Sequence, residues 1–225
     1  QSLNRKTNMK VNLVSYSRVP DDSELPDDML QLVAYCARVS NPSNQNNTET
    51  SEKLVKYLIK HKHWSPLEMV NVCLEIDTTR DIARQLLRHR SFTFQEFSQR
   101  YANPDEGFEN MFEKREARLQ DEKNRQNSVP TDDKTIQHDW FRIQSRVEYM
   151  AAKCYKEALK LGIAKEQARA LLPEGLTKSR LYVNGTLRSW LHYIDLRSSN
   201  GTQLEHCEIA KACGEVIYKL FPMDE

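Results

Sequence analysis

The chain has 225 residues, of which 39% are hydrophobic and 29% charged, so it can bury one sizeable core beneath a very polar surface, and a helix-rich structure is expected. Its net charge of +1 excludes the overall basic excess of a nucleic-acid coat protein and leaves any anion site to a local cluster. The five cysteines form no C-x-x-C pair, no apolar run approaches the roughly 20 residues that span a bilayer, and no signal peptide is visible, so we expect a cytoplasmic protein with reduced thiols and no membrane partner.

The first third of the chain predicts strands and helices in alternation. Residues 1–8 are polar and unpatterned, and we interpret them as a tail, native or added, before a single domain over 9–225. Alternation of apolar and polar residues predicts strands over 10–19 and 69–77. Helical periodicity predicts helices over 26–40 and 51–61, joined by a polar loop over 41–49, and proline restarts the chain over 65–68.

The next segment predicts a helix that ends in cations. Residues 78–90 have a threonine cap, Asp81 near the start and arginines at the end, a polarity that suits the helix dipole. After residue 90 the helical period is lost, and residues 91–101 alternate phenylalanines with polar residues. This pattern predicts a turn and a short extended segment.

The second half of the chain predicts mostly helices. Residues 104–135 are charged and lack a long apolar run, so we interpret them as a surface insertion or lid, with a solvated helix over 108–126 and a loop over 127–133. Further helices are predicted over 135–162, 164–173, 187–197 and 202–221, with a strand and turn over 179–186. In the helix over 135–162, one face carries Trp140, Ile143, Val147 and Met150, and Gly162 provides the stop.

A cluster of cations lies at the end of the helix over 78–90. Arg84 and Arg88 are four residues apart and Gln85 and Arg88 three apart, so their side chains are neighbours on the helix. Adjacent arginines repel one another unless an anion lies between them, and a guanidinium group binds phosphate through two bonds. The alternative is that these cations serve the helix dipole and point into water.

The stretch that follows adds an acid, a hydroxyl and aromatic rings. Glu96, Ser98 and Arg100 alternate, so an extended segment would place them on one face, where they could grip a polar heterocycle and its phosphate. The phenylalanines at 92, 94 and 97 could stack a planar ligand, although core packing is favoured for at least one of them.

Other candidate sites are weaker. His61 and His63 form an H-x-H that could ligate zinc, but no third ligand is evident nearby, and a wall for a ligand ring or phosphate or a plain helix end are the alternatives. Arg169 and Arg197 lie near helix ends, and with the other arginines they suit a phosphorylated ligand. The six glycines form no G-x-G-x-x-G and no P-loop, and no cysteine stands in an activating setting.

The signature R-H-R, seven residues, then S resembles that of the flavin-dependent thymidylate synthases. It runs from Arg88-His89-Arg90 to Ser98 and is followed by Gln99-Arg100-Tyr101. The resemblance extends over 37–40, 61–68, 167–169, 184–197 and the last helix, and covers 104–135 least.

The resemblance implies a fold, a reaction and an assembly. The implied fold is α/β (α+β), a mostly antiparallel central sheet flanked by helices. The implied reaction converts dUMP to dTMP, with methylenetetrahydrofolate as the one-carbon donor and FAD, reduced by NADPH, as the reductant. The implied assembly is a homotetramer whose active sites are built from several subunits, with no nucleic-acid polymer as a partner.

The resemblance also implies roles for individual residues, and none of them binds a metal. The residues that resemble the family's FAD pocket are Ser40, His63, Ser65, Glu68, Arg88, His89, Arg90, Gln95, Glu96, Asn184, Leu187, Arg188 and His192. Those that resemble its dUMP site are Gln85, Arg88, Glu96, Phe97, Ser98, Gln99, Arg100, Arg169 and Arg197.

Arg197 matches the arginine that polarises the uracil, and it is the candidate catalytic residue. A cation beside the pyrimidine amide stabilises enolate-like charge, so that carbon 5 becomes nucleophilic without an enzyme thiol. Ser98 has no evident base, which assigns it to binding and not to nucleophilic attack.

The chain departs from the family pattern at several positions. Gln95 stands where asparagine is usual, Gln99 where glycine is common, and Met69 and Gly201 where many members have histidine. These departures leave the nucleotide site intact and put the flavin and folate contacts in question. Two other functions remain open: a binder of single-stranded RNA or nucleotides that stacks bases on phenylalanines, and a metal-dependent nucleotide hydrolase that uses His61, His63 and acids.

Overall fold

The structure, a computed structural model, describes residues 9–25, 27–199 and 201–222. The predicted tail over residues 1–8 lies outside the described residues, and the single-domain interpretation stays a prediction. Four strands form an antiparallel sheet in the order β1-β2-β6-β3. They are β1 (Lys10–Tyr16), β2 (Asn71–Thr79), β3 (Thr93–Glu96) and β6 (Lys178–Thr186). This sheet is the antiparallel one that the resemblance implies.

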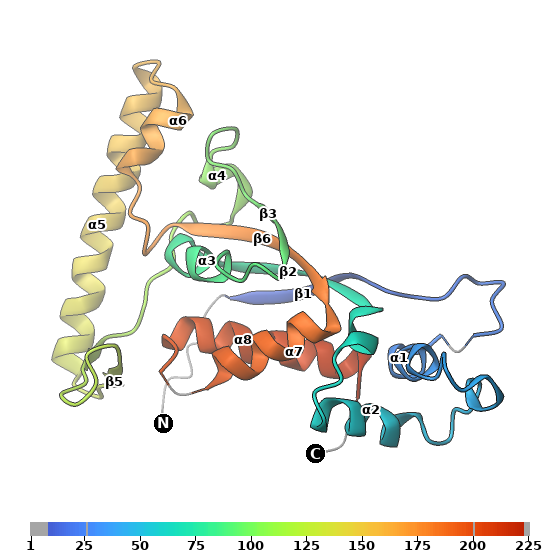
Figure 1. Cartoon of the computed structure of the whole chain (residues 1–225). Coiled ribbons are helices and arrows are strands. Elements are labelled where there is room, and N and C mark those ends of the chain that lie inside the picture. The colour runs from blue at the N-terminus through green and yellow to red at the C-terminus, as the bar shows by residue number, and fades with distance from the viewer. Residues whose placement is uncertain (1–8, 26, 200, 223–225) are drawn as a thin grey trace.

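The main core lies between one face of the sheet and two C-terminal helices. Leu74 faces Val183 and Ile76 faces Leu181 across the β2–β6 pair, and all four side chains are fully buried. Beneath them lie α7 (Leu187–Ser198) and α8 (Leu204–Leu220), side by side (Figure 1). Trp190 of α7 donates its indole N–H to the carbonyl of Val72 at 2.9 Å, which joins helix and sheet.

Two N-terminal helices, α1 (Met29–Ala37) and α2 (Ser51–Lys60), extend this core at one end of the sheet (Figure 1). The Asp28 side chain caps α1 by accepting the Gln31 amide at 2.9 Å, which is why the helix begins at residue 29. The short turns η1 (Pro42–Asn44) and η2 (Ser65–Glu68) follow α1 and α2 respectively.

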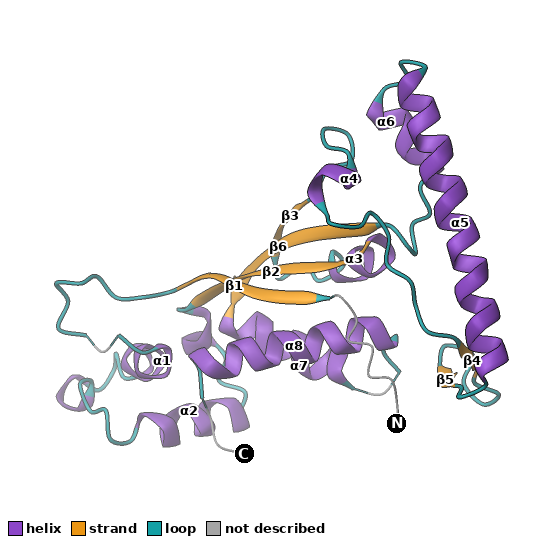
Figure 2. Ribbon diagram, turned by 180° about the vertical axis from the view of Figure 1, so that it is seen from behind, coloured by secondary structure: helices purple, strands orange, loops and turns teal. Residues whose placement is uncertain are grey.

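A long helix, α5 (Lys134–Lys160), stands apart from the sheet, with α6 (Lys165–Ala168) at one end and the β4–β5 hairpin at the other (Figure 2). Gly162 has φ +81° and ends α5, as predicted. A second, smaller core of Met111, Phe112, Tyr155 and Ala168 joins this arm to the preceding loop. None of the described helices is long and apolar enough to cross a membrane.

The predicted helix over 108–126 is wrong. The chain there is extended and then forms a hairpin of β4 (Arg118–Gln120) and β5 (Ser128–Pro130), after the single turn of α4 (Pro104–Gly107). The side-chain amide of Gln144 on α5 bonds both the N–H and the C=O of Arg115, at 2.8 and 2.9 Å. Gln137 does the same for Ala117, at 2.9 and 3.1 Å. These paired bonds hold the segment extended along α5.

Several predicted boundaries also differ: for example, the strand predicted over 10–19 ends at Tyr16, and the helix predicted over 26–40 is Met29–Ala37. The strand predicted over 69–77 runs over 71–79, and α3 (Arg80–Leu86) is shorter than the predicted 78–90. The cap position is therefore Thr79, whose hydroxyl bonds Asp81 at 2.6 Å and not a backbone amide. Glu96, Ser98 and Arg100 do not share one extended face, because β3 ends at Glu96 and Ser98 accepts the Tyr101 amide within a turn.

Candidate active site

Arg197 and His89 form the centre of the candidate site. The Nε of Arg197, in the last turn of α7, donates to Nε2 of His89, just beyond α3, at 3.0 Å. Burial, followed by the charges of Arg197 and Arg88, lowers the pKa of His89. The imidazole is therefore a neutral acceptor, and the terminal guanidinium nitrogens of Arg197 have no hydrogen-bond partner in the described residues.

Gln85 on α3 lies beside this pair and is held by α8. Its Nε2 donates to Gln203 at 2.8 Å, and its Oε1 lies 3.2 Å from Nδ1 of His206. The His206 ring centroid is 6.2 Å from that of His89 and 5.7 Å from that of Tyr193. His206 was not predicted as a site residue, although its spacing from Ile209 and Cys213 on the buried face of α8 is a signal in the sequence.

Glu96, at the end of β3, is the acid of the site. It accepts the Ser179 hydroxyl at 2.8 Å and lies 3.7 Å from Arg80. Burial lowers the pKa of Arg80, Glu96 opposes this, and the cations Arg84 and Arg169 lower it further. Arg80 therefore lies among other cations with Glu96 as its nearest carboxylate, and such a group of guanidinium groups suits a bound anion.

The predicted arginines divide into paired and unpaired groups. Arg84 pairs with Glu174, and Arg100 lies 3.6 Å from Glu166. Arg88 and Arg90 are exposed and make no ion pair within the described chain. Unpaired guanidinium groups beside a signature loop are open to phosphate, whereas the paired ones must exchange a carboxylate for it.

All three phenylalanines of the signature loop pack on protein. Phe92 is 6% exposed and lies 4.5 Å from the ring of Trp190, and Phe94 packs against the same core. The Phe97 ring lies 5.2 Å from that of Phe108. Core packing, favoured for at least one of them, is confirmed for Phe92.

The other loop residues predicted to bind the nucleotide are Ser98, partly buried in the turn, and Gln99, which is 2% exposed. The Gln99 side-chain nitrogen has no partner in the described part of the chain. Arg169 begins η3 (Arg169–Leu171) and donates its Nε to the Glu166 carbonyl at 3.2 Å.

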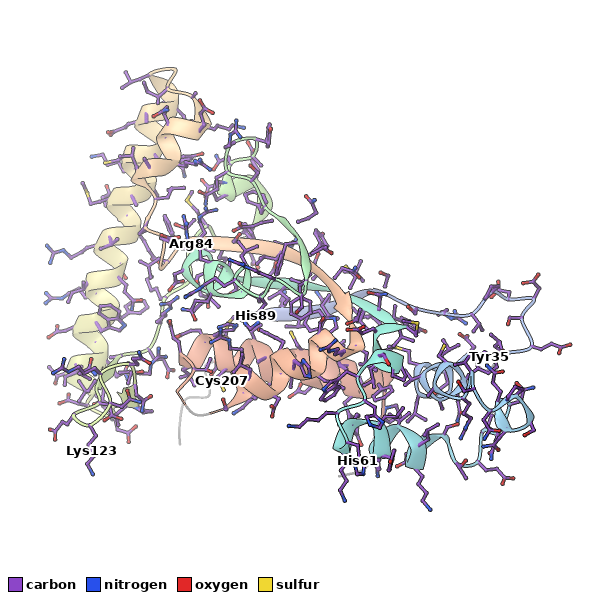
Figure 3. All side chains as sticks on the ribbon, viewed as in Figure 1. Tyr35, His61, Arg84, His89, Lys123 and Cys207 are labelled. Atoms are coloured by element: carbon purple, nitrogen blue, oxygen red, sulfur yellow. The ribbon has the colours of Figure 1, made fainter. Side chains whose placement is uncertain are left out.

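The predicted FAD residues outside the signature fall into separate groups. Glu68 in η2 pairs with Arg188 of α7, and the His192 ring lies 4.4 Å from that of Trp64. Ser65 lies in the same turn, and His63 and Ser40 are exposed near α2 and α1. In Figure 3 the labelled His61 marks this α2 end, whereas the labelled His89 lies between the sheet and the α7–α8 pair.

Three further predicted FAD residues lie on β3, β6 and α7. Gln95 and Asn184 are exposed on the same face of the sheet, because Thr93 pairs with Asn184 and Gln95 with Tyr182. The Leu187 side chain is fully buried in the main core. One chain therefore does not gather all of the predicted FAD residues into a single pocket.

The pair His61 and His63 does not form a metal site in the described residues, and two of the cysteines are not activated as thiolates. The His61 and His63 rings are 6.3 Å apart, and no group of three or more metal-binding side chains occurs among the described residues. Burial raises the pKa of the Cys213 thiol. Burial also raises the pKa of the Cys73 thiol, although a hydrogen bond with Ser15 lowers that pKa in part. These two cysteines are therefore poor thiolates.

Comparison with known proteins identifies the family. The model of the family described as "Thymidylate synthase complementing protein" matches residues 23–223. The "Probable flavin-dependent thymidylate synthase" of Paramecium bursaria Chlorella virus 1 is 51% identical over 195 residues, which cover 85% of this chain and 87% of that protein. The "Flavin-dependent thymidylate synthase" of Synechocystis sp. is 49% identical over 191 residues, which cover 85% of each chain.

A solved structure supports the fold. The UMP/dUMP methylase PolB from Streptomyces cacaoi, bound with 5-Br dUMP, superposes with a TM-score of 0.76 at 26% identity and covers 96% of this chain and 92% of its own. The mixed fold with an antiparallel sheet is thereby confirmed. Since the family model spans most of the sequence and two relatives are about half identical to it, the chain belongs to the thymidylate synthase complementing proteins, the family of flavin-dependent thymidylate synthases.

Proposed function

We propose that this chain converts dUMP to dTMP, with methylenetetrahydrofolate as the one-carbon donor, NADPH as the reductant and FAD as the flavin. The observation that carries the proposal is the Arg197–His89 pair. A neutral imidazole holds the guanidinium through Nε and leaves its terminal nitrogens without a partner in the described residues. Such a fixed cation suits a planar pyrimidine amide, to which it can donate two hydrogen bonds.

Arg197 would activate the uracil by stabilising negative charge on its carbonyl and N3. Arg197 is half-buried and already oriented, so it stabilises the developing charge more than a cation in water, where the solvent must first reorganise. Carbon 5 then attacks the one-carbon group without a covalent bond to the enzyme. The raised thiol pKa of Cys213 and Cys73 supports a route without a thiolate.

The nucleotide would lie among residues of α3, the signature loop and η3. We propose that it is held by Gln85, Arg88, Glu96, Phe97, Ser98, Gln99, Arg100, Arg169 and Arg197. The cations near Arg80, which are Arg84 and Arg169, would supply donors for the phosphate. Arg88 is open to the ligand, since it has no ion pair within the described chain.

The donor set also fits FAD. Its pyrophosphate needs cations, and Arg88 and Arg90 are exposed guanidinium groups that no described carboxylate neutralises. FAD, when bound, supplies the redox chemistry that links NADPH to the one-carbon group. We propose that it is held by Ser40, His63, Ser65, Glu68, Arg88, His89, Arg90, Gln95, Glu96, Asn184, Leu187, Arg188 and His192.

We also propose a homotetramer with sites shared among subunits. The FAD residues lie in separate groups on one chain, so a complete pocket calls for more than one copy. An exposed apolar stripe on α5 supports assembly: Ile136, Trp140, Ile143, Val147 and Met150 are 37% to 53% exposed and follow a spacing of four and three residues. That spacing forms the seam by which helices pair.

The test is an absorbance spectrum followed by an activity assay. Purified protein is mixed with FAD, freed of excess, and scanned from about 300 to 550 nm, where flavins absorb and lose colour on reduction. We expect retained flavin bands that bleach with NADPH, and then dTMP from dUMP and methylenetetrahydrofolate. UMP is assayed beside dUMP, because PolB is described as a UMP/dUMP methylase. Protein that retains no FAD and makes no methylated nucleotide would refute the proposal.

A further inference from the structure

The side-chain amide of Gln85 is held at both ends by the start of α8. Its nitrogen donates to Oε1 of Gln203 at 2.8 Å, and its oxygen lies 3.2 Å from Nδ1 of His206. Gln203 is the residue that precedes α8, and His206 lies in its first turn. Two side chains from one helix end thus fix a residue of the proposed nucleotide site.

A buried carboxylate sets the direction of these hydrogen bonds. Glu205 is 6% exposed, lies 2.7 Å from Arg118 and 3.8 Å from Arg115, and accepts from Nε2 of Gln203 at 3.0 Å. Burial raises the pKa of the Glu205 carboxyl, but the two arginines, together with a bond from the residue's own backbone amide, outweigh burial and bring that pKa below its ordinary value. An ionised carboxylate only accepts hydrogen bonds, so Gln203 must turn its nitrogen toward Glu205 and its oxygen toward Gln85.

The same reasoning fixes the proton on His206. Gln85 must present its nitrogen to Gln203, which leaves its oxygen facing His206, and Nδ1 of His206 must therefore be the donor. His206 is fully buried, and its Nε2 has no partner within the described part of the protein. Burying Nε2 without a partner costs free energy of folding. The bond from Nδ1 to Gln85 is the one hydrogen bond of this ring within the described residues.

We propose that His206 and Gln203 are positioning residues for dUMP: they hold the Gln85 amide in the orientation that binds the nucleotide. The inference rests on the proposed assignment of Gln85 to the dUMP site. It also gives a role to the segment that leads into β4, because Arg115 and the first β4 residue, Arg118, anchor Glu205 at the outer end of the same chain of bonds. Neither His206 nor Gln203 needs to touch the ligand.

The experiment measures dUMP binding to FAD-loaded enzyme by calorimetry, together with kcat and the KM for dUMP. His206→Leu removes the donor, and we expect the Kd and KM for dUMP to rise about tenfold, the value of one lost hydrogen bond, with kcat changed less than about twofold. His206→Asn restores a donor near the Nδ1 position, and we expect it to recover most of the affinity. Gln203→Leu should weaken dUMP binding as His206→Leu does.

A double-mutant cycle separates positioning from general damage. If His206 acts through Gln85, the double variant Gln85→Ala with His206→Leu binds dUMP no more weakly than Gln85→Ala alone. The matched control is Ile209→Val, which trims a buried residue of the same helix whose apolar side chain cannot hydrogen-bond Gln85. We expect its dUMP affinity to be that of the wild type.

Several results would overturn the proposal. It is wrong if His206→Leu and Gln203→Leu both bind dUMP like the wild type, if His206→Asn is as impaired as His206→Leu, or if Ile209→Val loses as much affinity. Additive losses in the double variant would also reject it. If the wild type binds FAD but no dUMP, the proposed function fails as well, and that outcome is distinct from a failure confined to the variants.

Discussion

The proton on His89 decides how Arg197 is held. If the imidazole were protonated, its Nε2 could not accept from Arg197 at 3.0 Å, and two cations would face each other. Burial and the neighbouring arginines lower the pKa of His89, so the neutral form that the hydrogen bond needs is also the form the surroundings favour. The signature histidine thus orients the arginine that we propose to be catalytic, without neutralising it.

His206 makes the folded protein sensitive to acid. Burial, then the charges of Arg197 and His89, lower its pKa to about 4, whereas an unfolded histidine titrates near 6.5. Between these pH values the unfolded chain binds more protons than the folded one. The contribution of His206 to the free energy of unfolding is therefore fully present above pH about 6.5, and up to about 3 kcal/mol of it is lost as the pH drops toward 4. His89, Arg197, Tyr193 and Gln85 face the ring.

The measurement is the melting temperature of FAD-loaded enzyme from pH 7.5 to 4.5, for the wild type and for His206→Asn. We expect the wild type to lose more stability than the variant as the pH falls, because the variant cannot titrate at this position. Parallel curves would show that His206 does not contribute to the acid sensitivity.

For single residues, the family resemblance assigned Arg197 to the nucleotide and His89 to FAD, but their hydrogen bond was not predicted, since the two residues are 108 apart in sequence. The clamp on Gln85 was not predictable, because it joins α3 to α8 through hydrogen bonds that leave no periodic pattern. The hypothesis that Phe92 stacks on a planar ligand is wrong, because its ring is buried against Trp190 and cannot reach a ligand.

Among the elements, β6 depends on a glycine. A Cβ added at Gly185 would lie 2.3 Å from Cδ1 of Phe92, a ring buried against Trp190. The close approach places Phe92 directly on β6 and so ties the signature loop to the sheet.

Gly185→Ala should therefore destabilise the protein by about 1 to 3 kcal/mol, the range for overpacking a core. Gly175→Ala is the matched control, since its nearest neighbour would be Asp81 Oδ2 at 4.0 Å. Thermal unfolding of both variants checks this, and equal melting temperatures would contradict it.

Sequence periodicity predicted most elements because their apolar residues repeat with the period of a buried helix or strand. It located β6, α2, α5 and α7 within about two residues at either end, the usual accuracy of helix boundaries. It failed over 108–126, where Gln137 and Gln144 hold an extended backbone through amide bonds. Such hydrogen bonds from α5 leave no pattern of apolar residues in the segment that they hold. The high charge of this segment therefore led to the wrong prediction of a solvated helix.

For the whole molecule, the exposed stripe on α5 is the feature that one chain does not explain. Its five apolar residues follow the spacing of a helix-pairing seam, and solvent exposure of such a seam is costly. Pairing of α5 with another copy would bury this stripe.

Val147→Glu places a charge in this stripe and should shift the enzyme from the proposed tetramer to smaller species, because burying an unpaired charge is costly. Lys153→Glu, on the same helix and off the stripe, is the matched control. Sedimentation of both variants gives the masses. A tetramer that survives Val147→Glu would place the subunit contacts elsewhere.

The measurement that tests the central claim most directly is dTMP formation by FAD-loaded wild type and Arg197→Lys at saturating dUMP. We predict that the wild type makes dTMP only with methylenetetrahydrofolate and NADPH present. Arg197→Lys should keep its flavin spectrum and lose at least about 100-fold in kcat, because lysine keeps the charge but not the planar pair of donors. A wild type without dTMP formation, or a variant with full turnover, would contradict the account.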